Sequence, residues 1–510
     1  MPTSASTSPP PPEAALPIRE TFGNRSVMGI AWLSLQTIGA KGVVLIGQII
    51  LAWLLSPEDF GLIGLAYTVS ALVGTLNNFG IEQVLVHRHL RFDRWASSAF
   101  WMSLTMGMGA AAIMAVAAPF ASRMYGEPRL TGLLLVLAIA APLGNLVIVP
   151  KAKVQTQLRF RFMAGSGFIQ TVATMGLTVL FAVLGFDAYS FVLPMPIVAI
   201  GMAGWYWWSA PSPVHARLQW RRWKFLFGDS ALLFIIGLLW TVTSQGDYFI
   251  LGLFYSAEIV GIYYFAFNLS LQSVGLFMDN LRNVLFPILS KLNDDPPRQV
   301  AAFMRSTRVL TLVTVPACLL QAAVAAPVID LLFGARWQDS IPVLRILSVA
   351  MALRVVGDTG GSLLTAQGRF KTRLWLVVFR TAIFFPLVFV GARWAGPVGA
   401  AWGILAYYAL YTPVSLLVML RPSNVRLWAM GQLFIPTLVI GGVSVGIAYV
   451  ATFWLERYSW GSFPQIVLCC LIGLTLYVLM MRKADAQAWD ELMTRFHPLL
   501  KLFRLRSVFG

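Results

Sequence analysis

Charged side chains lie inside long apolar stretches of this sequence, where burying a charge is costly. Such charges face a water-filled cavity or pair with a partner, so they mark where the chain could handle ions or charged ligands. They are the cations Lys41, Arg282, Arg345, Arg354 and Arg380 and the acids Glu82, Asp247, Asp279 and Asp358.

The cations are candidates for binding an anion. Lys41 stands midway along its apolar stretch between small residues, too far from either interface to reach it easily. It either faces a cavity or pairs with an acid on a neighbouring helix. Arginine binds phosphate with two hydrogen bonds, whereas lysine acts as a point charge, so Arg354, Arg380 and Arg282 are the further candidates. Arg345 lies near a segment end, where its side chain can reach the interface.

Two acid–base pairs are close in sequence. Arg354 and Asp358 are four residues apart, and Asp279 and Arg282 are three apart. Each pair therefore shares one face of a helix and can neutralise itself. The alternative is that these residues exchange partners while the protein works.

Asp247 is the first candidate for binding a coupling ion. It follows the polar run 243–245, which is unusual inside an apolar stretch. Oxygen ligands suit sodium, and a buried carboxylate can also carry a proton. Asp358, Asp279 and Glu82 are further candidates. The alternative for Asp247 is a polar cluster that holds helices together.

Motifs of soluble catalytic sites are absent from the sequence. The three cysteines and four histidines have no spacing typical of a disulfide framework or a metal site, and there is no HExxH. There is no GxxxxGK[ST] loop for ATP and no D-x-D for a metal-dependent glycosyltransferase. We therefore expect neither a metal nor an enzyme.

The composition indicates a membrane protein. Hydrophobic residues make up 58% of the 510 residues and charged residues only 12%, whereas soluble domains carry about 25% charged residues. Since a spanning helix needs about 20 apolar residues, we predict an all-α polytopic protein with fourteen spans. These are 27–54, 61–84, 96–118, 130–150, 163–185, 188–208, 226–252, 259–290, 303–326, 341–365, 374–392, 397–420, 428–453 and 462–481.

The loop charges predict the orientation. With these spans, 28 of the 38 Lys and Arg residues fall in alternate loops and the two tails, five fall on the other side, and five lie within spans. Basic residues favour the cytoplasmic side, so both termini should be cytoplasmic. The net charge of +17 is therefore a topology signal and does not indicate nucleic-acid binding.

An internal repeat divides the chain. At a shift of 200 residues, Glu58, Gly61 and Ala66 on the outer side match Glu258, Gly261 and Ala266. At a shift of 210, the inner-side run 157–161 (QLRFR) matches 367–371 (QGRFK). We therefore predict two parallel six-helix lobes around an axis along the membrane normal, with a cavity between them. The predicted regions are a disordered tail (1–25), lobe 1 (26–208), a cytoplasmic linker (209–225), lobe 2 (226–420), two extra helices (421–481) and a basic amphipathic tail (482–510), which lies on the membrane or packs on loops.

Three motifs carry a resemblance to a known family. They are L-x-P-E-D-F-G-x-x-x-L-A at 55–66, L-L-F-G-A-R-W at 331–337 and A-Q-G-R-F at 366–370. Together they resemble the polysaccharide-transporter branch, or Wzx-type flippases, of the multidrug/oligosaccharidyl-lipid/polysaccharide (MOP) exporter superfamily. The resemblance extends over residues 25–480 and implies the MATE-like fold of two six-helix lobes, often with two added helices.

The resemblance also implies a function. The family translocates undecaprenyl-diphosphate-linked oligosaccharide from the cytoplasmic to the periplasmic leaflet of the bacterial inner membrane, for exopolysaccharide, O-antigen or capsule. Transport by alternating access would be coupled to protons or sodium, with no other cofactor. The candidate cations Lys41, Arg354, Arg380 and Arg282 would meet the diphosphate. Implied partners are the lipid-linked oligosaccharide, the bilayer, and the polymerase and chain-length proteins of the pathway, and we expect a monomer.

Two other functions stay open at this point. One is export of small molecules or drugs by a member of the same superfamily. The other is a membrane-embedded glycosyltransferase or polymerase, which would need an acidic metal-binding motif or a long outer loop. The basic residues within the spans favour an anionic lipid substrate over a cationic drug.

Overall fold

The described part of the chain is largely helical and contains no β-strand. The computed structural model describes residues 18–75, 81–87, 92–215, 223, 231–421, 427–456 and 461–484. The basic tail beyond residue 484 and more than half of the predicted linker lie outside these ranges. The first helix begins at Ile18, so residues 18–25 are helical and not part of a disordered tail. The Pro- and Ser-rich composition ends at Pro17, and proline is compatible with a helix start.

Helices α1 to α9 form one group, which we call the N-half. They are α1 (Ile18–Leu54), α2 (Pro57–Gly74), α3 (Ile81–His87), α4 (Phe92–Tyr125), α5 (Arg129–Asn145), α6 (Ile148–Thr156), α7 (Phe160–Val183), α8 (Tyr189–Val192) and α9 (Pro194–Ser209). Within this group α4 packs on α5, α1 on α7 and α5 on α9.

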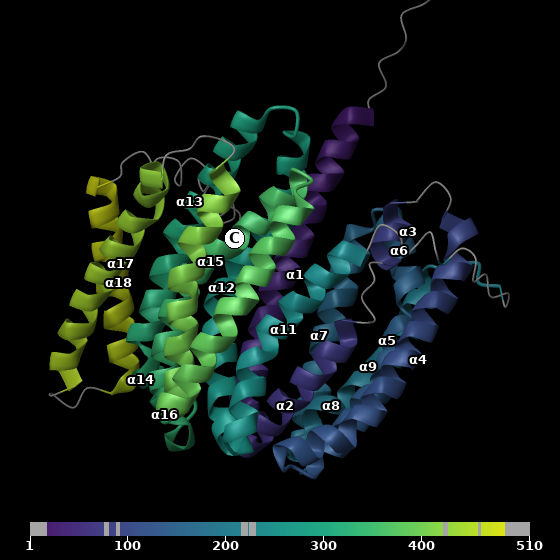
Figure 1. Cartoon of the computed structure of the whole chain (residues 1–510), viewed down its shortest axis with the longest axis horizontal. Helices are drawn as coiled ribbons and strands as arrows, with labels where there is room; N and C mark the ends of the chain where they lie inside the picture. Colours follow the sequence, from purple (N-terminus) through teal and green to yellow (C-terminus); the bar gives the residue numbers. More distant parts are fainter. Residues whose placement is uncertain are drawn as a thin grey trace, which may run out of the picture.

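Helices α11 to α16 form the second group, the C-half. They are α11 (Ala231–Phe254), α12 (Ala257–Lys291), α13 (Pro296–Ala323), α14 (Ala325–Leu332), the short 3-10 helix η3 (Ala335–Trp337), α15 (Ser340–Ala366) and α16 (Phe370–Leu420). Two further helices, α17 (Leu427–Glu456) and α18 (Ser462–Ala484), pack on each other and on α13 and α14. Figure 1 shows them at the outer edge of the C-half.

The predicted polytopic architecture is confirmed. Among the described residues, 11 helical segments are long and apolar enough to cross a membrane. The second and eighth predicted spans are not among them, but α2 and α12 are helical there. One of the 11, the 51-residue α16, covers the eleventh and twelfth predicted spans. The exact number of fourteen stays a prediction.

Helix α16 is two helices folded against each other. The backbone is non-helical at Ala395 and Gly396, where Gly396 has φ 59°. Past this point the chain reverses direction and packs against itself. The two backbones are so close that a Cβ on Gly391 would lie 2.1 Å from the carbonyl oxygen of Gly399. A Cβ on Gly403 would likewise lie 2.6 Å from the oxygen of Leu387. Glycine lets the two backbones touch, as small residues do in membrane helix pairs.

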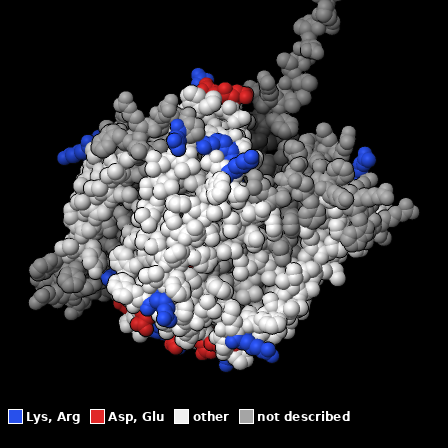
Figure 2. Space-filling model, in the orientation of Figure 1, with Lys and Arg blue, Asp and Glu red and all other residues white. Residues whose placement is uncertain are grey.

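The two halves lie closest together towards one end of the molecule. In Figure 1 their ribbons converge at the lower end, where α2 and α12 begin, and lie apart at the upper end. The lower end carries the loops predicted to be outer, and the upper end those predicted to be inner. On the face seen in Figure 2, charged side chains gather towards the two ends, and the broad band between them is uncharged. That distribution is typical of a protein embedded in a bilayer.

The repeat predicted at the outer side forms a symmetric contact. A Cβ on Gly61 would lie 1.7 Å from the oxygen of Ala257, and a Cβ on Gly261 would lie 1.7 Å from the oxygen of Pro57. Residues 57 and 257 correspond at the same shift of 200 as the two glycines. The first turns of α2 and α12 therefore cross backbone to backbone around the axis that relates the halves.

The repeat predicted at the inner side forms two equivalent turns. Leu158 and Gly368 both have positive φ, 53° and 67°. In each turn the arginine that follows donates from Nη1 to a carbonyl oxygen at the end of the half's last helix. Arg159 reaches Ser209 at 3.0 Å, and Arg369 reaches Met419 at 3.1 Å. Both contacts obey the shift of 210, and a cation at a helix C-terminus is favourable.

The motif at 331–337 ties the C-half to the N-half at the outer end. Trp337 is fully buried between the rings of Phe60, at 5.0 Å, and Phe265, at 4.1 Å. Its Nε1 donates to the oxygen of Ala52 at 3.0 Å. Arg336 donates to the oxygen of Leu55 at 3.2 Å. We call residues 331–337 the outer strap, because they cap the end of α1 from the other half.

Candidate functional site

The C-half contains a buried charged cluster. Arg354 on α15 donates from Nε to Asp358 one turn later, at 2.9 Å. Arg380 on α16 donates from Nη1 to the other oxygen of Asp358, at 3.4 Å. The side chains of Asp358 and Arg380 are only 2% and 3% exposed. The close packing of α15 and α16 thus places one carboxylate between two guanidinium groups.

Arg380 is held by aromatic rings but is incompletely hydrogen-bonded. Its guanidinium lies 3.9 Å from the ring centroid of Trp240 and 5.8 Å from those of Tyr407 and Tyr411. Such cation–π contacts stabilise a desolvated cation. Among the described residues, however, its buried Nε has no hydrogen-bond partner. A buried charged donor without a hydrogen bond is energetically costly. The Nε of Arg380 is therefore available to donate to a further acceptor.

Asp247 lies in the same part of the C-half. Its carboxylate is 1% exposed and accepts hydrogen bonds from the Tyr263 hydroxyl at 2.9 Å and from the Tyr248 amide at 3.0 Å. Thr243, one turn earlier on α11, shares a hydrogen bond with Thr381 at 2.8 Å. The polar run that precedes Asp247 therefore partly packs helices, as one of the two alternatives predicted, while Asp247 itself lines a cavity.

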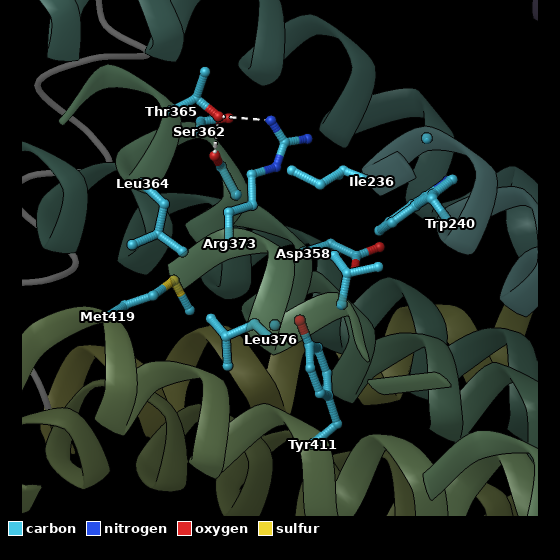
Figure 3. A pocket seen from close by; sticks show the side chains of 14 residues that line it. Ile236, Trp240, Asp358, Ser362, Leu364, Thr365, Arg373, Leu376, Tyr411 and Met419 are labelled. Atoms are coloured by element: carbon cyan, nitrogen blue, oxygen red, sulfur yellow. Dashed lines mark hydrogen bonds between the residues drawn. The ribbon is translucent and has the colours of Figure 1, made fainter. Parts of the chain in front are cut away.

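Two cavities adjoin the cluster. The first, which we call the arginine cavity, has a volume of about 230 Å³ and is lined by Arg354, Arg380 and Asp247, with Tyr67 of α2 contributed by the N-half. The second has a volume of about 400 Å³ and lies among α11, α15 and α16 (Figure 3). Asp358 and Trp240 line this second cavity, so the Asp358–Arg380 pair stands between the two.

Four of the eight predicted site residues thus come together, namely Arg354, Arg380, Asp247 and Asp358. Glu82 does not join them. It lies in the N-half, where its carboxylate pairs with Lys151 at 3.1 Å and accepts a hydrogen bond from Gln155 at 2.5 Å. Glu82 and Lys151 line a separate cavity of about 560 Å³.

Of the other three predicted residues, one does not line the cavities of the cluster, and the side chains of two lie outside the described residues. Lys41 is half-buried on α1 and lies within the apolar stretch Gln36–Leu54. Lys41 does not line either of the two C-half cavities. Asp279 and Arg282 belong to α12, and their side chains lie outside the described residues.

The repeat shows that the three positions of the charged cluster are uncharged in the other half. At the shift of 210, three positions of the charged cluster have counterparts that line the N-half cavity. The counterparts of Arg354, Asp358 and Arg380 are Gly144, Ile148 and Gln170. Corresponding positions of both halves therefore face cavities, but these three positions are charged in the C-half and uncharged in the N-half.

Sequence reasoning missed the aromatic part of the site. Trp240 and Tyr263 are not among the charged candidates from the sequence, yet the ring of Trp240 lies against Arg380 and the hydroxyl of Tyr263 donates to Asp247. For Trp240 a signal existed, since it precedes Asp247 by seven residues and therefore shares its helical face. For Tyr263, which lies on another helix, no such signal existed. Among the described residues, no group of three His, Cys, Asp or Glu side chains could hold a metal ion.

Comparison with known proteins places these features in a family. Residues 50–342 match the family model described as "Polysaccharide biosynthesis protein". The lipopolysaccharide biosynthesis protein WzxC of Escherichia coli is 26% identical over 445 residues, 82% of this chain and 87% of that protein. The succinoglycan biosynthesis transport protein ExoT of Rhizobium meliloti is 25% identical over 374 residues, 71% of this chain and 74% of that protein.

Solved structures share the fold. The lipid II flippase MurJ in an inward closed conformation superposes with a TM-score of 0.71 at 14% identity, covering 88% of this chain and 98% of that one. An inward-facing multidrug MATE transporter of the MOP superfamily superposes with a TM-score of 0.59 at 17% identity, covering 75% and 94%. The MATE-like fold predicted from the sequence is confirmed. With more than half of its length matched by the family model, this multi-pass membrane protein belongs to the polysaccharide biosynthesis protein family.

Proposed function

We propose that the protein is a flippase that moves an undecaprenyl-diphosphate-linked oligosaccharide from the inner to the outer leaflet of a bacterial inner membrane. The product would supply exopolysaccharide, O-antigen or capsule synthesis. Two relatives support this, one named for lipopolysaccharide biosynthesis and one for succinoglycan transport. A structural neighbour is named a lipid II flippase. The loop charges favour both termini in the cytoplasm.

The observation that carries the proposal is the pair of buried arginines. Arg354 and Arg380 share Asp358, and both line the arginine cavity. Guanidinium groups bind phosphate with short, charge-assisted hydrogen bonds. The unused Nε of Arg380 would find its acceptor in the diphosphate. A cavity lined by two cations and one acid, Asp247, suits an anion better than a cationic drug, which argues against a drug exporter.

The geometry also supports alternating access. The inner-turn contacts of Arg159 and Arg369 each tie the start of one helix to the end of another within the same half. Each half can therefore move as a unit. The halves contact each other at the α2–α12 crossing and the outer strap, so opening to the outer side would require these contacts to part. Asp247, which lines the arginine cavity, is the proposed site of the coupling proton or sodium ion.

A flipping assay tests the proposal. Purified protein is reconstituted into vesicles with a fluorescent undecaprenyl-diphosphate-linked oligosaccharide, and its movement between leaflets is followed by quenching from one side. Wild-type protein should accelerate flipping. Arg380→Gln should slow it by about tenfold to a hundredfold, since a hydrogen bond to a charged group contributes about 1.5–3 kcal/mol. Arg380→Lys should retain part of the activity because the charge remains.

The matched control is Arg298→Gln, whose side chain is 80% exposed and should flip at the wild-type rate. Size-exclusion profiles confirm that each variant is folded. If wild-type protein leaves the lipid in its original leaflet, or if Arg380→Gln flips as fast as wild type, the proposal is wrong.

A further inference from the structure

The second cavity of the C-half has walls that differ from those of a packed core. It is lined from α11 by Trp240 and Gly237, from α15 by Asp358, Gly361, Ser362 and Thr365, and from α16 by residues that include Arg373 and Tyr411. Figure 3 shows Thr365, Ser362 and Arg373 at one end and Trp240, Asp358 and Tyr411 around the other.

Glycines keep part of this volume open. A Cβ placed on Gly237 or Gly361 would meet no atom within 4 Å, so both positions have room for a side chain. Glycine destabilises a helix relative to alanine, and neither glycine here permits a close backbone contact or a positive φ. The two glycines therefore lower helix stability while they keep the cavity open. Such glycines are expected where a ligand occupies the open space.

The chemistry of the walls fits a sugar ring. Trp240 and Tyr411 offer aromatic surface, and the Ser362 and Thr365 hydroxyls can both donate and accept. Arg373 donates to Thr365 Oγ1 at 2.8 Å, which fixes one end of the cavity. A sugar hydroxyl also donates and accepts at once, and a few placed polar groups among apolar ones are typical of small-ligand sites. An alkyl chain would offer no hydrogen-bond partner to the polar groups of these walls.

The position of the cavity indicates which sugar of the oligosaccharide it would bind. Asp358 lines it and pairs with Arg380, and Arg380 also lines the arginine cavity. A ligand whose diphosphate occupies the arginine cavity would place its next group beyond this pair. We infer that the glycine-walled cavity binds the sugar attached directly to the diphosphate. This inference rests on the proposed function.

Binding measurements with two lipids test it. The probes are bare undecaprenyl diphosphate and the same lipid carrying one glucose, galactose or N-acetylglucosamine, each titrated into wild-type protein in nanodiscs. The best of the three sugar-bearing lipids should bind about tenfold tighter than the bare lipid, a difference of about 1.4 kcal/mol. In Gly361→Val and Gly237→Val the sugar should add nothing, while the affinity for bare lipid stays at the wild-type value.

The control is Gly442→Val. That glycine is exposed on α17 and its Cβ would also meet nothing within 4 Å, so the preference for the sugar should persist. Should a valine variant fail to fold, Gly361→Ala, which adds one methyl group in the same space, should still reduce the preference. Binding of neither lipid by wild type would overturn the proposed function itself. If wild type binds both lipids equally, or if the valine variants weaken both equally, only the inference on the sugar is overturned.

Discussion

At the scale of single residues, Asp358 is the group that neutralises the charge of both arginines in the site. Its carboxylate pairs with Arg354 at 2.9 Å and Arg380 at 3.4 Å while being almost wholly buried. The buried carboxylate neutralises the two guanidinium groups. An anionic ligand would have to share these groups with the carboxylate or displace it from them. Asp247 is different, since its hydrogen bonds come from neutral donors, Tyr263 and Tyr248.

Removing the charge of Asp358 should destabilise the protein strongly. Asp358→Asn leaves two buried guanidinium groups without this counter-ion, and breaking a buried ion pair costs about 3–5 kcal/mol. The unfolding midpoint in detergent should fall accordingly. Asp295→Asn, at a site whose side chain is 43% exposed, is the control and should change the midpoint little. An Asp358→Asn protein as stable as wild type would show that Asp358 does not neutralise the arginines.

Asp247 should affect coupling more than binding. Asp247→Asn keeps the shape of the side chain but cannot carry a proton or the charge that binds sodium. We expect flipping by this variant to continue without stimulation by an imposed proton or sodium gradient. The measurement is the initial rate with and without each gradient, with Asp295→Asn as control. Gradient stimulation equal to that of wild type would remove Asp247 from the coupling site.

At the scale of elements, the outer strap connects the halves through one buried tryptophan. Trp337→Ala removes a fully buried ring that contacts Phe60 and Phe265 and donates to Ala52. Large-to-small changes of this kind cost about 3–5 kcal/mol, so the unfolding midpoint should drop. Trp394→Ala, at a residue that is 80% exposed, is the matched control. Equal midpoints for the two variants would contradict a role of the strap in holding the outer end closed.

The sequence predicted most elements and one of their breaks, since the gap between the predicted spans 374–392 and 397–420 contains the non-helical residues of α16. Apolar length and loop charge were sufficient for the helices, and the matched runs at 157–161 and 367–371 predicted equivalent turns. The break between α5 and α6 falls at Leu146 and Val147, and its signal is Pro150, which cannot donate the helical hydrogen bond to the oxygen of Leu146. The Arg380–Asp358 pair could not be predicted, since it depends on how α15 and α16 pack. The pair of Arg354 and Asp358 lies on one helix, and there spacing alone was sufficient.

At the scale of the whole molecule, two related halves cross backbone to backbone and differ in charge at the positions of the buried cluster. The backbones cross at Gly61 and Gly261, whose match was visible in the sequence, although their contact was not. The N-half cavity has Gly144 and Gln170 where the C-half has Arg354 and Arg380. A symmetric frame thus holds an asymmetric site, so we expect the charged headgroup to bind to the C-half.

The crossing itself can be tested with one methyl group. Gly61→Ala would place a Cβ 1.7 Å from the oxygen of Ala257, and backbone on both sides leaves no room to relax. The first turns of α2 and α12 should move apart. Spin labels at Glu58 and Glu258, both exposed, should report a longer distance. Gly176→Ala, exposed on α7 with open space at its Cβ, is the control. An unchanged label distance in Gly61→Ala would contradict the close crossing.

Mass spectrometry of lipids that co-purify with the protein tests the central claim most directly. Wild-type protein isolated from its native membrane in mild detergent should retain a polyprenyl-diphosphate-linked oligosaccharide. The double variant Arg354→Gln, Arg380→Gln should lose it while keeping ordinary phospholipids, because only the diphosphate needs the two guanidinium groups. Equal retention of the oligosaccharide lipid by both proteins, or its absence from wild type, would contradict the assignment of the arginine cavity as its binding site.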